Sequence, residues 1–302
     1  MIKLGIKTDA IQTRYSYDWL FDLLQEEGIH FVQLGAFFEM FHMEGDDYFV
    51  ALKEKASSRN LRIKSMFSAY REFGGFFYND LHMEKAARKM YEKYIHIAGA
   101  LGLDYAGTNP GAVYRDQMHN KALGVETYLK HMKELQHLAY EKGLKAFAME
   151  PMSCMAEPPT TPQEMDYMVG VLNEYHRKHP NNTVPVWLCG DISHGLANEY
   201  KEIVYSNLQL FEHAIPMMCE FHFKNTDQHY HSTFGFSEEE MAKGIIDLQE
   251  IKQICETKAE KWPVKEVVGY LEIGGPKIGR DYSDPQLGDA LRTSLRALKA
   301  VF

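Results

Sequence analysis

The sequence has no excess of positive charge. Its 33 lysine and arginine residues are outnumbered by 42 aspartate and glutamate residues, which gives a formal net charge of −9 at pH 7 over 302 residues. Proteins that bind nucleic acid usually present a basic surface, because the phosphates must be neutralised. Nucleic acid is therefore not expected as a partner.

Cysteine is scarce, and long apolar runs are absent. The chain has 4 cysteines, none of them in a C-x-x-C pair, so we expect reduced, buried thiols rather than disulfides or thiolate metal ligands. No apolar run approaches the about 18 residues that a membrane-spanning helix needs. The first residues, "MIKLGIKTDA", lack the apolar stretch of a signal peptide. These features predict no membrane association and a cytoplasmic location.

The sequence does contain a regular alternation of short apolar runs and longer amphipathic segments. The apolar runs have the length and the bounding Gly, Pro and Asp residues of buried strands. Alternation of this kind predicts parallel strands joined by helices, and eight such units in about 300 residues suit a closed barrel. We predict a single (β/α)8 TIM barrel that forms one domain over residues 1–302. The expected strands are 2–8, 30–37, 61–70, 104–111, 145–152, 184–193, 219–227 and 267–275.

Polar side chains stand at the ends of the last four expected strands. Glu150 follows "AFAM", Asp191 follows "WLCG", His222 lies within "CEFHF", and Glu272 follows "VVGYL". Each has an ordinary structural explanation. His222 could be a hydrogen-bonded core histidine, Asp191 could cap a helix, and Glu150 could be a solvated loop residue. Glu272 poses the sharpest question, because an unpaired carboxylate in an apolar strand costs several kcal/mol.

The joint occurrence of these four residues favours a metal site over four separate explanations. A barrel brings the carboxyl ends of its strands to one side, where the chemistry of such folds takes place. Carboxylate and imidazole ligands suit a divalent ion, with Mn²⁺ as the first choice and Mg²⁺, Co²⁺ or Zn²⁺ as alternatives. A bound cation would also neutralise Glu272.

The pattern "AME…CGDISH…EFHF…YLE" resembles the xylose isomerase-like TIM barrel superfamily, and within it the branch of ketose 3-epimerases and sugar-phosphate isomerases/epimerases. The D-x-x-H motif of that superfamily matches Asp191 and His194. The resemblance implies that Glu150, Asp191, His222 and Glu272 bind the metal. It also implies that Glu150 and Glu272 transfer protons through a metal-stabilised enediolate of a ketose or ketose phosphate.

The resemblance also suggests residues that contact the substrate. His194 would bind a substrate oxygen that gains charge. Many relatives have an arginine a few residues after the histidine of the seventh strand, and Lys224 is the nearest cation to that position in this sequence. Segment 274–283 could bind a phosphate through backbone N–H groups and its two cations, or could be a plain turn. The full set of predicted substrate-binding residues is His194, Lys224, Asn109, Glu157, Lys277 and Arg280.

Two further expectations concern partners and alternative chemistry. The aromatic-rich segment 69–80 could form a lid over the sugar or a subunit contact, and the contact is favoured, so we expect a homo-oligomer. The alternative activity is a metal-dependent lyase that acts on 3-keto sugar glycosides with a small partner subunit. The same metal and bases would serve that reaction, so the sequence does not separate the two.

Overall fold

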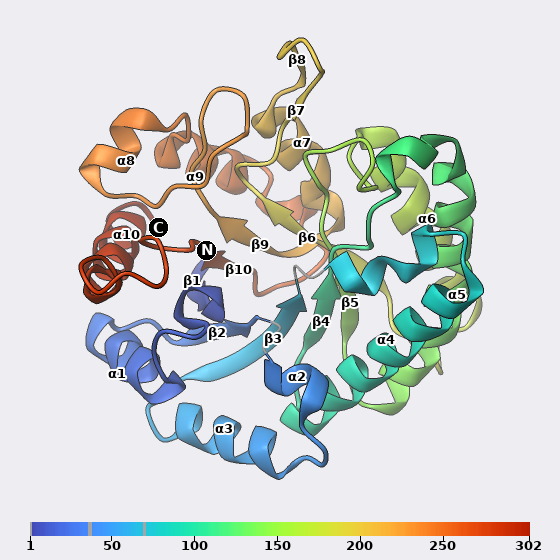
Figure 1. Cartoon of the computed structure of the whole chain (residues 1–302), viewed down its shortest axis with the longest axis horizontal. Helices are drawn as coiled ribbons and strands as arrows, with labels where there is room; N and C mark the ends of the chain where they lie inside the picture. The colour runs from blue at the N-terminus through green and yellow to red at the C-terminus, as the bar shows by residue number, and fades with distance from the viewer. Residues whose placement is uncertain (1, 36–37, 69–70) are drawn as a thin grey trace. The chain divides into compact units, whose positions relative to one another are not determined.

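A computed structural model of the chain describes residues 2–35, 38–68 and 71–302 (Figure 1). Its main feature is a closed barrel of parallel strands in the order β1-β10-β9-β6-β5-β4-β3-β2. The predicted fold class is therefore confirmed, with strands that are shorter than the sequence suggested. The barrel strands are β1 (Lys3–Lys7), β2 (Phe31–Leu34), β3 (Arg62–Ser68), β4 (Tyr105–Thr108), β5 (Ala146–Met149), β6 (Val186–Asp191), β9 (Met218–Phe223) and β10 (Val268–Leu271).

Helices follow the strands along the chain, as expected for a β/α barrel. Among the described residues, none of them is both long and apolar enough to cross a membrane. They are α1 (Tyr17–Glu27), α2 (Phe38–His42), α3 (Asp47–Ser57), α4 (Leu81–Leu101), α5 (Lys121–Glu141), α6 (Pro162–Lys178), α7 (Asn207–Ala214), α8 (Glu238–Lys243), α9 (Leu248–Thr257) and α10 (Leu287–Val301).

Helix boundaries follow from local sequence signals. The side chain of Ser16 accepts a hydrogen bond from the backbone of Trp19 at the start of α1, and Gly28 ends this helix with φ of 66°. Only glycine adopts that left-handed conformation without a steric penalty. Thr161 caps α6 in the same way as Ser16 caps α1, and Pro162 occupies the first turn. Residues of these types are common at helix starts and ends.

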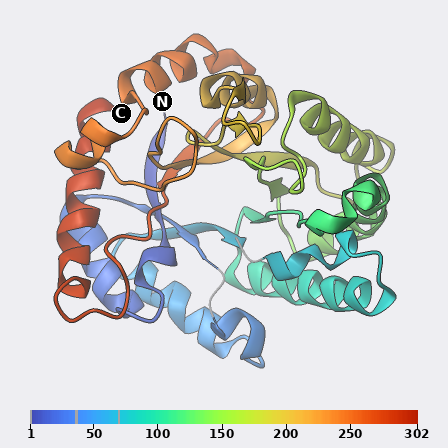
Figure 2. The ribbon, with the colours of Figure 1, turned by 45° about the horizontal axis from the view of Figure 1, so that its top comes forward.

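The chain divides into two compact units, and the first comprises residues 1–35, 51–64 and 190–302. Within it, β1 pairs in parallel with both β10 and β2, and β10 pairs with β9. The register places Lys7 beside Gln33 and His222 beside Tyr270. Helix α10 lies alongside α1 (Figures 1 and 2), where Arg296 forms hydrogen bonds with Glu27. The carboxyl ends of these strands thus carry several polar side chains in register.

The second unit comprises residues 36–50 and 65–189. Here β3, β4, β5 and β6 pair in sequence, all in parallel. The aromatic segment that the sequence suggested as a lid or subunit contact belongs to this unit. Phe73, Phe76 and Phe77 are each at most 2% exposed and pack around Tyr91 and Tyr128. These three rings are therefore core, which corrects the expectation for them; Tyr70 lies outside the described residues.

One element was not predicted from the sequence. A hairpin of β7 (Leu196–Ala197) and β8 (Ile203–Tyr205) follows β6 and was not predicted. All 4 cysteines are free, as expected, and Cys189, Cys219 and Cys255 are buried. The assignment of the whole chain to one domain stays a prediction.

Candidate metal centre

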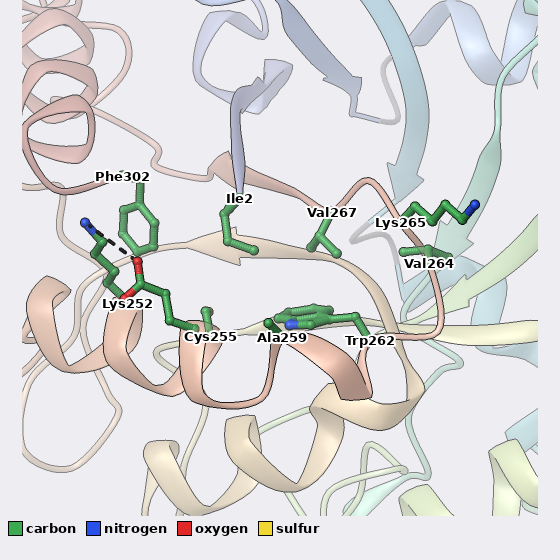
Figure 3. A pocket seen from close by; sticks show the side chains of 10 residues that line it. Ile2, Lys252, Cys255, Ala259, Trp262, Val264, Lys265, Val267 and Phe302 are labelled. Carbon is green, nitrogen blue, oxygen red and sulfur yellow. Dashed lines mark ion pairs between the residues drawn. The ribbon is translucent and has the colours of Figure 1, made fainter.

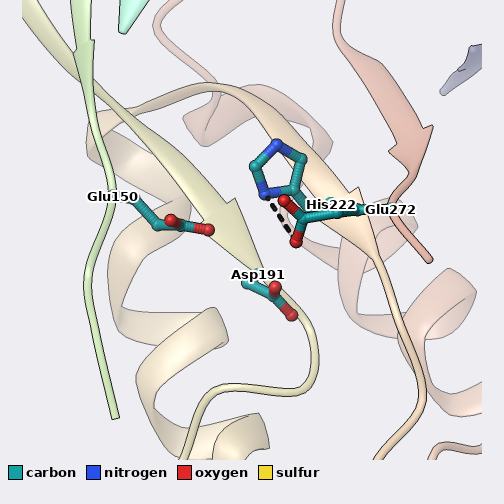
Figure 4. Close-up of side chains that lie close together, drawn as sticks. All are labelled: Glu150, Asp191, His222 and Glu272. Atoms are coloured by element: carbon teal, nitrogen blue, oxygen red, sulfur yellow. Dashed lines mark ion pairs between the residues drawn. The ribbon is translucent and has the colours of Figure 1, made fainter. Parts of the chain in front are cut away.

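The four predicted ligands lie at or next to the carboxyl ends of their strands. Asp191 is the last residue of β6, His222 is the penultimate residue of β9, and Glu272 directly follows β10. Glu150 directly follows β5 and is 3% exposed, so it is not a solvated loop residue. Within the first unit, one ligand atom from each of Asp191, His222 and Glu272 lies within 4.8 Å of the other two (Figure 4).

The two carboxylate oxygens of Asp191 have different kinds of partner. Its Oδ1 accepts hydrogen bonds from the backbone N–H and the hydroxyl of Ser193, both at 2.7 Å. Its Oδ2 is buried and has no hydrogen bond from the described residues. Its partner is the Nζ of Lys224, which lies 2.6 Å away as an ion pair. No helix begins at Asp191, so the helix-cap explanation is wrong, and a buried carboxylate oxygen held by a cation at a strand end suits a cation ligand.

Glu272 is surrounded by cationic groups. Lys7 contacts its Oε1, Lys224 donates to its Oε2 at 2.8 Å, and the Nδ1 of His222 lies 3.6 Å from Oε2. Burial raises the pKa of this carboxyl group, but His222, Lys224 and Lys7 outweigh burial and hold the pKa well below its usual range. Glu272 is therefore ionised at neutral pH, and the protein's own cations explain how an apolar strand tolerates it.

The pKa of Asp191 is also lowered. Burial again opposes ionisation, while His194 and Lys224 favour it. Glu272 acts in the opposite direction, because two carboxylates close together repel each other. Two neighbouring ionised carboxylates are an arrangement that a divalent cation would stabilise.

Lys7 is the main residue that the sequence argument missed. Its side chain is 0% exposed, and its Nζ lies 2.8 Å from Asp9 Oδ2 as well as against Glu272. The register of β1 with β10 explains this contact, because Ile6 pairs with Leu271 and the next residues along the strands are Lys7 and Glu272. The rule about strand ends, applied to the first strand, would have identified Lys7.

His194 and Lys224 lie beside the predicted ligand Asp191. The Nε2 of His194 is 3.4 Å from Asp191 Oδ2 and 3.4 Å from the Nζ of Lys224. Both side chains are partly accessible, at 14% and 13%. They are therefore available to a substrate that binds at the strand ends.

Asn109 and Glu157 are buried polar residues of the second unit. Asn109 directly follows β4, and its Oδ1 is buried without a hydrogen-bond partner among the described residues. Glu157 Oε1 lies 3.4 Å from the guanidinium of Arg115, which also donates to the sulfur of Cys154 at 3.1 Å. The unsatisfied oxygen of Asn109 is consistent with its predicted contact to a polar ligand.

Lys277 and Arg280 are exposed residues in the loop after β10. Arg280 donates to its neighbour Gly279, and the N–H of Gly279 donates to the carboxylate of Asp284. The carboxylate of Asp284 therefore already accepts a hydrogen bond from an N–H group that was expected to bind a phosphate. Arg14 fixes the same loop through the carbonyl oxygens of Gly274 and Pro276. This geometry favours the plain-turn interpretation of segment 274–283.

A separate apolar pocket lies at the opposite ends of the strands. Its volume is about 130 Å³, and Ile2, Cys255, Trp262, Val267 and Phe302 are among the residues that line it (Figure 3). Ile2 precedes β1 and Val267 precedes β10, so the pocket is at the amino ends. In β/α barrels that end contributes to stability rather than to chemistry, and we do not assign the active site to it.

The fold is a parallel β/α barrel, and carboxylate and imidazole side chains lie at its strand ends. These features define a class of TIM-barrel proteins with a candidate metal site. The family can now be stated: the chain belongs to the xylose isomerase-like TIM barrel family, whose model matches residues 21–270. The resemblance inferred from the motifs is thereby confirmed. No curated protein matches the chain.

Solved structures support the same fold at low sequence identity. A Rhodospirillum rubrum protein assigned provisionally as a xylose isomerase matches with a TM-score of 0.79 and 19% identity, covering 100% of both chains. D-Psicose 3-epimerase from Clostridium cellulolyticum H10 matches with a TM-score of 0.72 and 13% identity, covering 99% of both. A xylose isomerase-like barrel from Mycobacterium smegmatis in complex with magnesium matches with a TM-score of 0.64 and 11% identity, covering 100% of this chain and 98% of its own. At these identities the neighbours show the fold of the chain.

Proposed function

We propose that this protein is a divalent-metal-dependent isomerase or epimerase of a ketose or ketose phosphate. The observation that carries the proposal is the grouping of Asp191, His222 and Glu272 in the first unit, with ligand atoms within 4.8 Å of one another at the strand ends. Glu150, at the end of β5, is the fourth ligand that the sequence pattern adds. Asp191 Oδ2 and Glu272 Oε2 lie 2.6 and 2.8 Å from the same ammonium group, that of Lys224, so a further cation beside the two carboxylates would offset their mutual repulsion. The oxygen-rich ligand set favours Mn²⁺, with Mg²⁺, Co²⁺ or Zn²⁺ as alternatives.

The proposed mechanism assigns proton transfer to the two glutamates. A bound divalent metal would supply Lewis-acid polarisation of the substrate carbonyl. Glu272 begins as a carboxylate, because His222, Lys224 and Lys7 hold its pKa low, so it can accept the proton from the carbon next to the carbonyl. Glu150 then gives the carbon a proton that it has taken up from solvent, and Glu272 releases the abstracted proton to solvent. Delivery to the opposite face of the same carbon gives the epimer. Delivery to the former carbonyl carbon, with a hydroxyl proton moving from the new carbonyl oxygen to the old one, gives the aldose.

The remaining residues orient the substrate. His194 is placed to hydrogen-bond the oxygen that gains negative charge, and Lys224 adds positive charge on the same side, 3.4 Å from His194. Asn109 and Glu157 are proposed as polar contacts to the sugar hydroxyls. Lys277 and Arg280 remain candidates only for a phosphorylated substrate. The cytoplasmic location and the homo-oligomer stay predictions from the sequence.

The decisive experiment combines metal analysis with solvent isotope exchange. The purified protein is analysed for bound metal, treated with chelator, and incubated in D₂O with added Mn²⁺ and a panel of pentuloses, hexuloses and their phosphates. We expect Mn²⁺-dependent deuterium uptake at a carbon next to the carbonyl of one sugar class. Glu150→Gln and Glu272→Gln should each abolish uptake, and Glu27→Gln, a change at a buried glutamate of α1, serves as the control.

Three outcomes would count against the proposal. Unchanged exchange in Glu150→Gln would remove the role assigned to that residue. Metal binding without exchange on any ketose would favour the lyase that acts on 3-keto sugar glycosides. Failure to bind any divalent metal would mean that the four side chains are not a metal site.

A further inference from the structure

A line of three fully buried polar side chains leads to the proposed metal ligand His222. Glu220 and His222 are two residues apart on β9 and therefore project to the same face of the strand. Gln33 comes from β2, and all three residues are 0% exposed. The Nε2 of Gln33 donates to Glu220 Oε1 at 2.9 Å, and the Oε1 of Gln33 lies 2.8 Å from the Nε2 of His222.

The chemistry of these groups fixes the direction of both hydrogen bonds. A carboxylate accepts hydrogen bonds and cannot donate them, so the NH₂ group of Gln33 must face Glu220. The amide oxygen of Gln33 then faces His222. Because an amide oxygen is only an acceptor, the Nε2 of His222 must carry a hydrogen and donate it.

A hydrogen on Nε2 has a direct consequence for the other ring nitrogen. In the neutral imidazole, Nδ1 then keeps its lone pair and can act as a metal ligand. Nδ1 is the nitrogen that faces Glu272, 3.6 Å from its Oε2, while the second ring nitrogen points away from that carboxylate (Figure 4). Without Gln33, the nearby carboxylate of Glu272 would favour a hydrogen on Nδ1, which would block the ligand position.

We propose that Glu220 and Gln33 are positioning residues that hold the hydrogen of His222 on Nε2 and so keep Nδ1 available as a ligand. The inference rests on the metal site proposed above for its functional meaning. The state of the ring itself can be tested without any metal. The chain of hydrogen bonds from Glu220 through Gln33 to His222, called the relay below, can therefore be tested independently of the proposed function.

The primary test is the tautomer of His222 in metal-free protein. Protein labelled with ¹⁵N in histidine gives two-bond ¹H–¹⁵N correlation patterns that distinguish the two neutral tautomers and the charged ring, and signals absent from His222→Gln identify the residue. We expect the Nε2 of His222 to carry a hydrogen in the wild-type protein. A neutral ring with its hydrogen on Nδ1 and none on Nε2 would overturn the proposal.

The sharpest variant is Glu220→Gln, because it preserves the shape of the side chain. An amide at position 220 can accept from Gln33 or donate to it, so the amide of Gln33 is no longer held in one orientation. We expect both neutral tautomers of His222 to become populated. A purely structural Glu220 would leave the tautomer of His222 unchanged, and that result would overturn the relay.

A second variant, Gln33→Leu, removes the acceptor for Nε2 entirely. Gln136→Leu is the matched control, because Gln136 is equally buried but donates to the backbone oxygens of Leu172 and Val184 on another part of the barrel. We expect Gln33→Leu, but not Gln136→Leu, to alter the His222 signals. Thermal unfolding of each variant confirms that it is folded before the spectra are compared.

Titration calorimetry with Mn²⁺ connects the ring to metal binding. Loss of a group that orients a metal-bound histidine typically weakens metal binding about 10- to 100-fold, so we expect a loss of this size for Glu220→Gln and Gln33→Leu and no change for Gln136→Leu. If wild-type protein binds no Mn²⁺ but shows the expected tautomer, the proposed function fails and the relay stands. If it binds Mn²⁺ with equal affinity in all variants, the relay fails and the proposed function stands.

Discussion

Two buried glutamates of the first unit, Glu27 and Glu272, show how similar charges can serve different purposes. Glu27, at the end of α1, is 6% exposed and accepts hydrogen bonds on both carboxylate oxygens from Arg296, with Arg292 as a second partner. Glu272 follows a barrel strand, is 14% exposed, and contacts Lys7 and Lys224. Both carboxyl groups have a lowered pKa, so the charge state alone does not distinguish them.

The distinguishing feature is what surrounds each carboxylate. The planar arginines give Glu27 a bidentate partner and leave neither oxygen unmatched. Glu272 shares the cation of Lys224 with a second carboxylate, Asp191, whose Oδ2 lacks a hydrogen bond from the described part of the chain. Two arginines of one neighbouring helix match Glu27, whereas Glu272, which also contacts Lys7, shares Lys224 with Asp191. The proposal above is that a further cation binds beside these two carboxylates.

The largest expected effect is the loss of sugar turnover when Glu272 is neutralised, compared with the same change at Glu27. Glu272→Gln should reduce sugar turnover about 100- to 10,000-fold, the range associated with loss of a general acid or base. Glu27→Gln should leave turnover within about 2-fold, because it lies in a helix contact and not in the catalytic machinery proposed above. Steady-state kinetics of both variants would check this. Equal losses in the two variants would contradict the distinction between the regions.

The next largest effect concerns Lys224 in the metal-free protein. Lys224→Met leaves Asp191 and Glu272 without a shared cation, and removal of one partner of a buried ion pair costs about 3 kcal/mol or more. We expect a corresponding decrease in the free energy of unfolding, measured with urea after chelator treatment. Lys252→Met is the control, because Lys252 bonds the carbonyl of Val301 and is 36% exposed. A smaller loss in Lys224→Met than in Lys252→Met would show that the shared lysine is not stabilising.

Much of the barrel and of the candidate site could be predicted from the sequence. The eight apolar runs identified the barrel strands, because parallel strands buried on both faces are apolar along their length. Parallel pairing then brings Asp191, His222 and Glu272 to the same side. The sequence could not show that Gln33 reaches His222, because this contact joins residues 189 positions apart and depends on where β2 and β9 face each other. It also could not show that Phe76 is core, because an aromatic ring serves a lid and a core equally well.

The effect of Mn²⁺ on the unfolding temperature should be intermediate in size, and it should differ between the Glu27 and Glu272 variants. A ligand that binds only the folded state at 100 times its Kd stabilises it by about 2.7 kcal/mol. We expect Mn²⁺ added to chelator-treated protein to raise the unfolding temperature of the wild type and of Glu27→Gln by the same amount. Glu272→Gln should show little or no increase, measured by differential scanning fluorimetry. An equal increase in all three proteins would place the metal elsewhere.

The smallest expected effect is the pH dependence of the Glu27 network. Hydrogen bonds from Arg296 lower the pKa of Glu27 from its ordinary value of 4.5, against the opposing effect of burial and with the help of Arg292. A carboxyl group whose pKa is lower in the folded state stabilises the fold above its unfolded-state pKa, and this contribution is lost as the pH falls through the folded-state pKa. Glu27→Gln should therefore be less stable than wild type by about 1 to 2 kcal/mol at pH 7, given the partial exposure of both arginines. The difference should stay constant down to about pH 5 and shrink below about pH 4.5, as measured by urea unfolding at each pH where both proteins remain folded. A difference that grows on acidification would mean that the arginines do not stabilise the ionised form of Glu27.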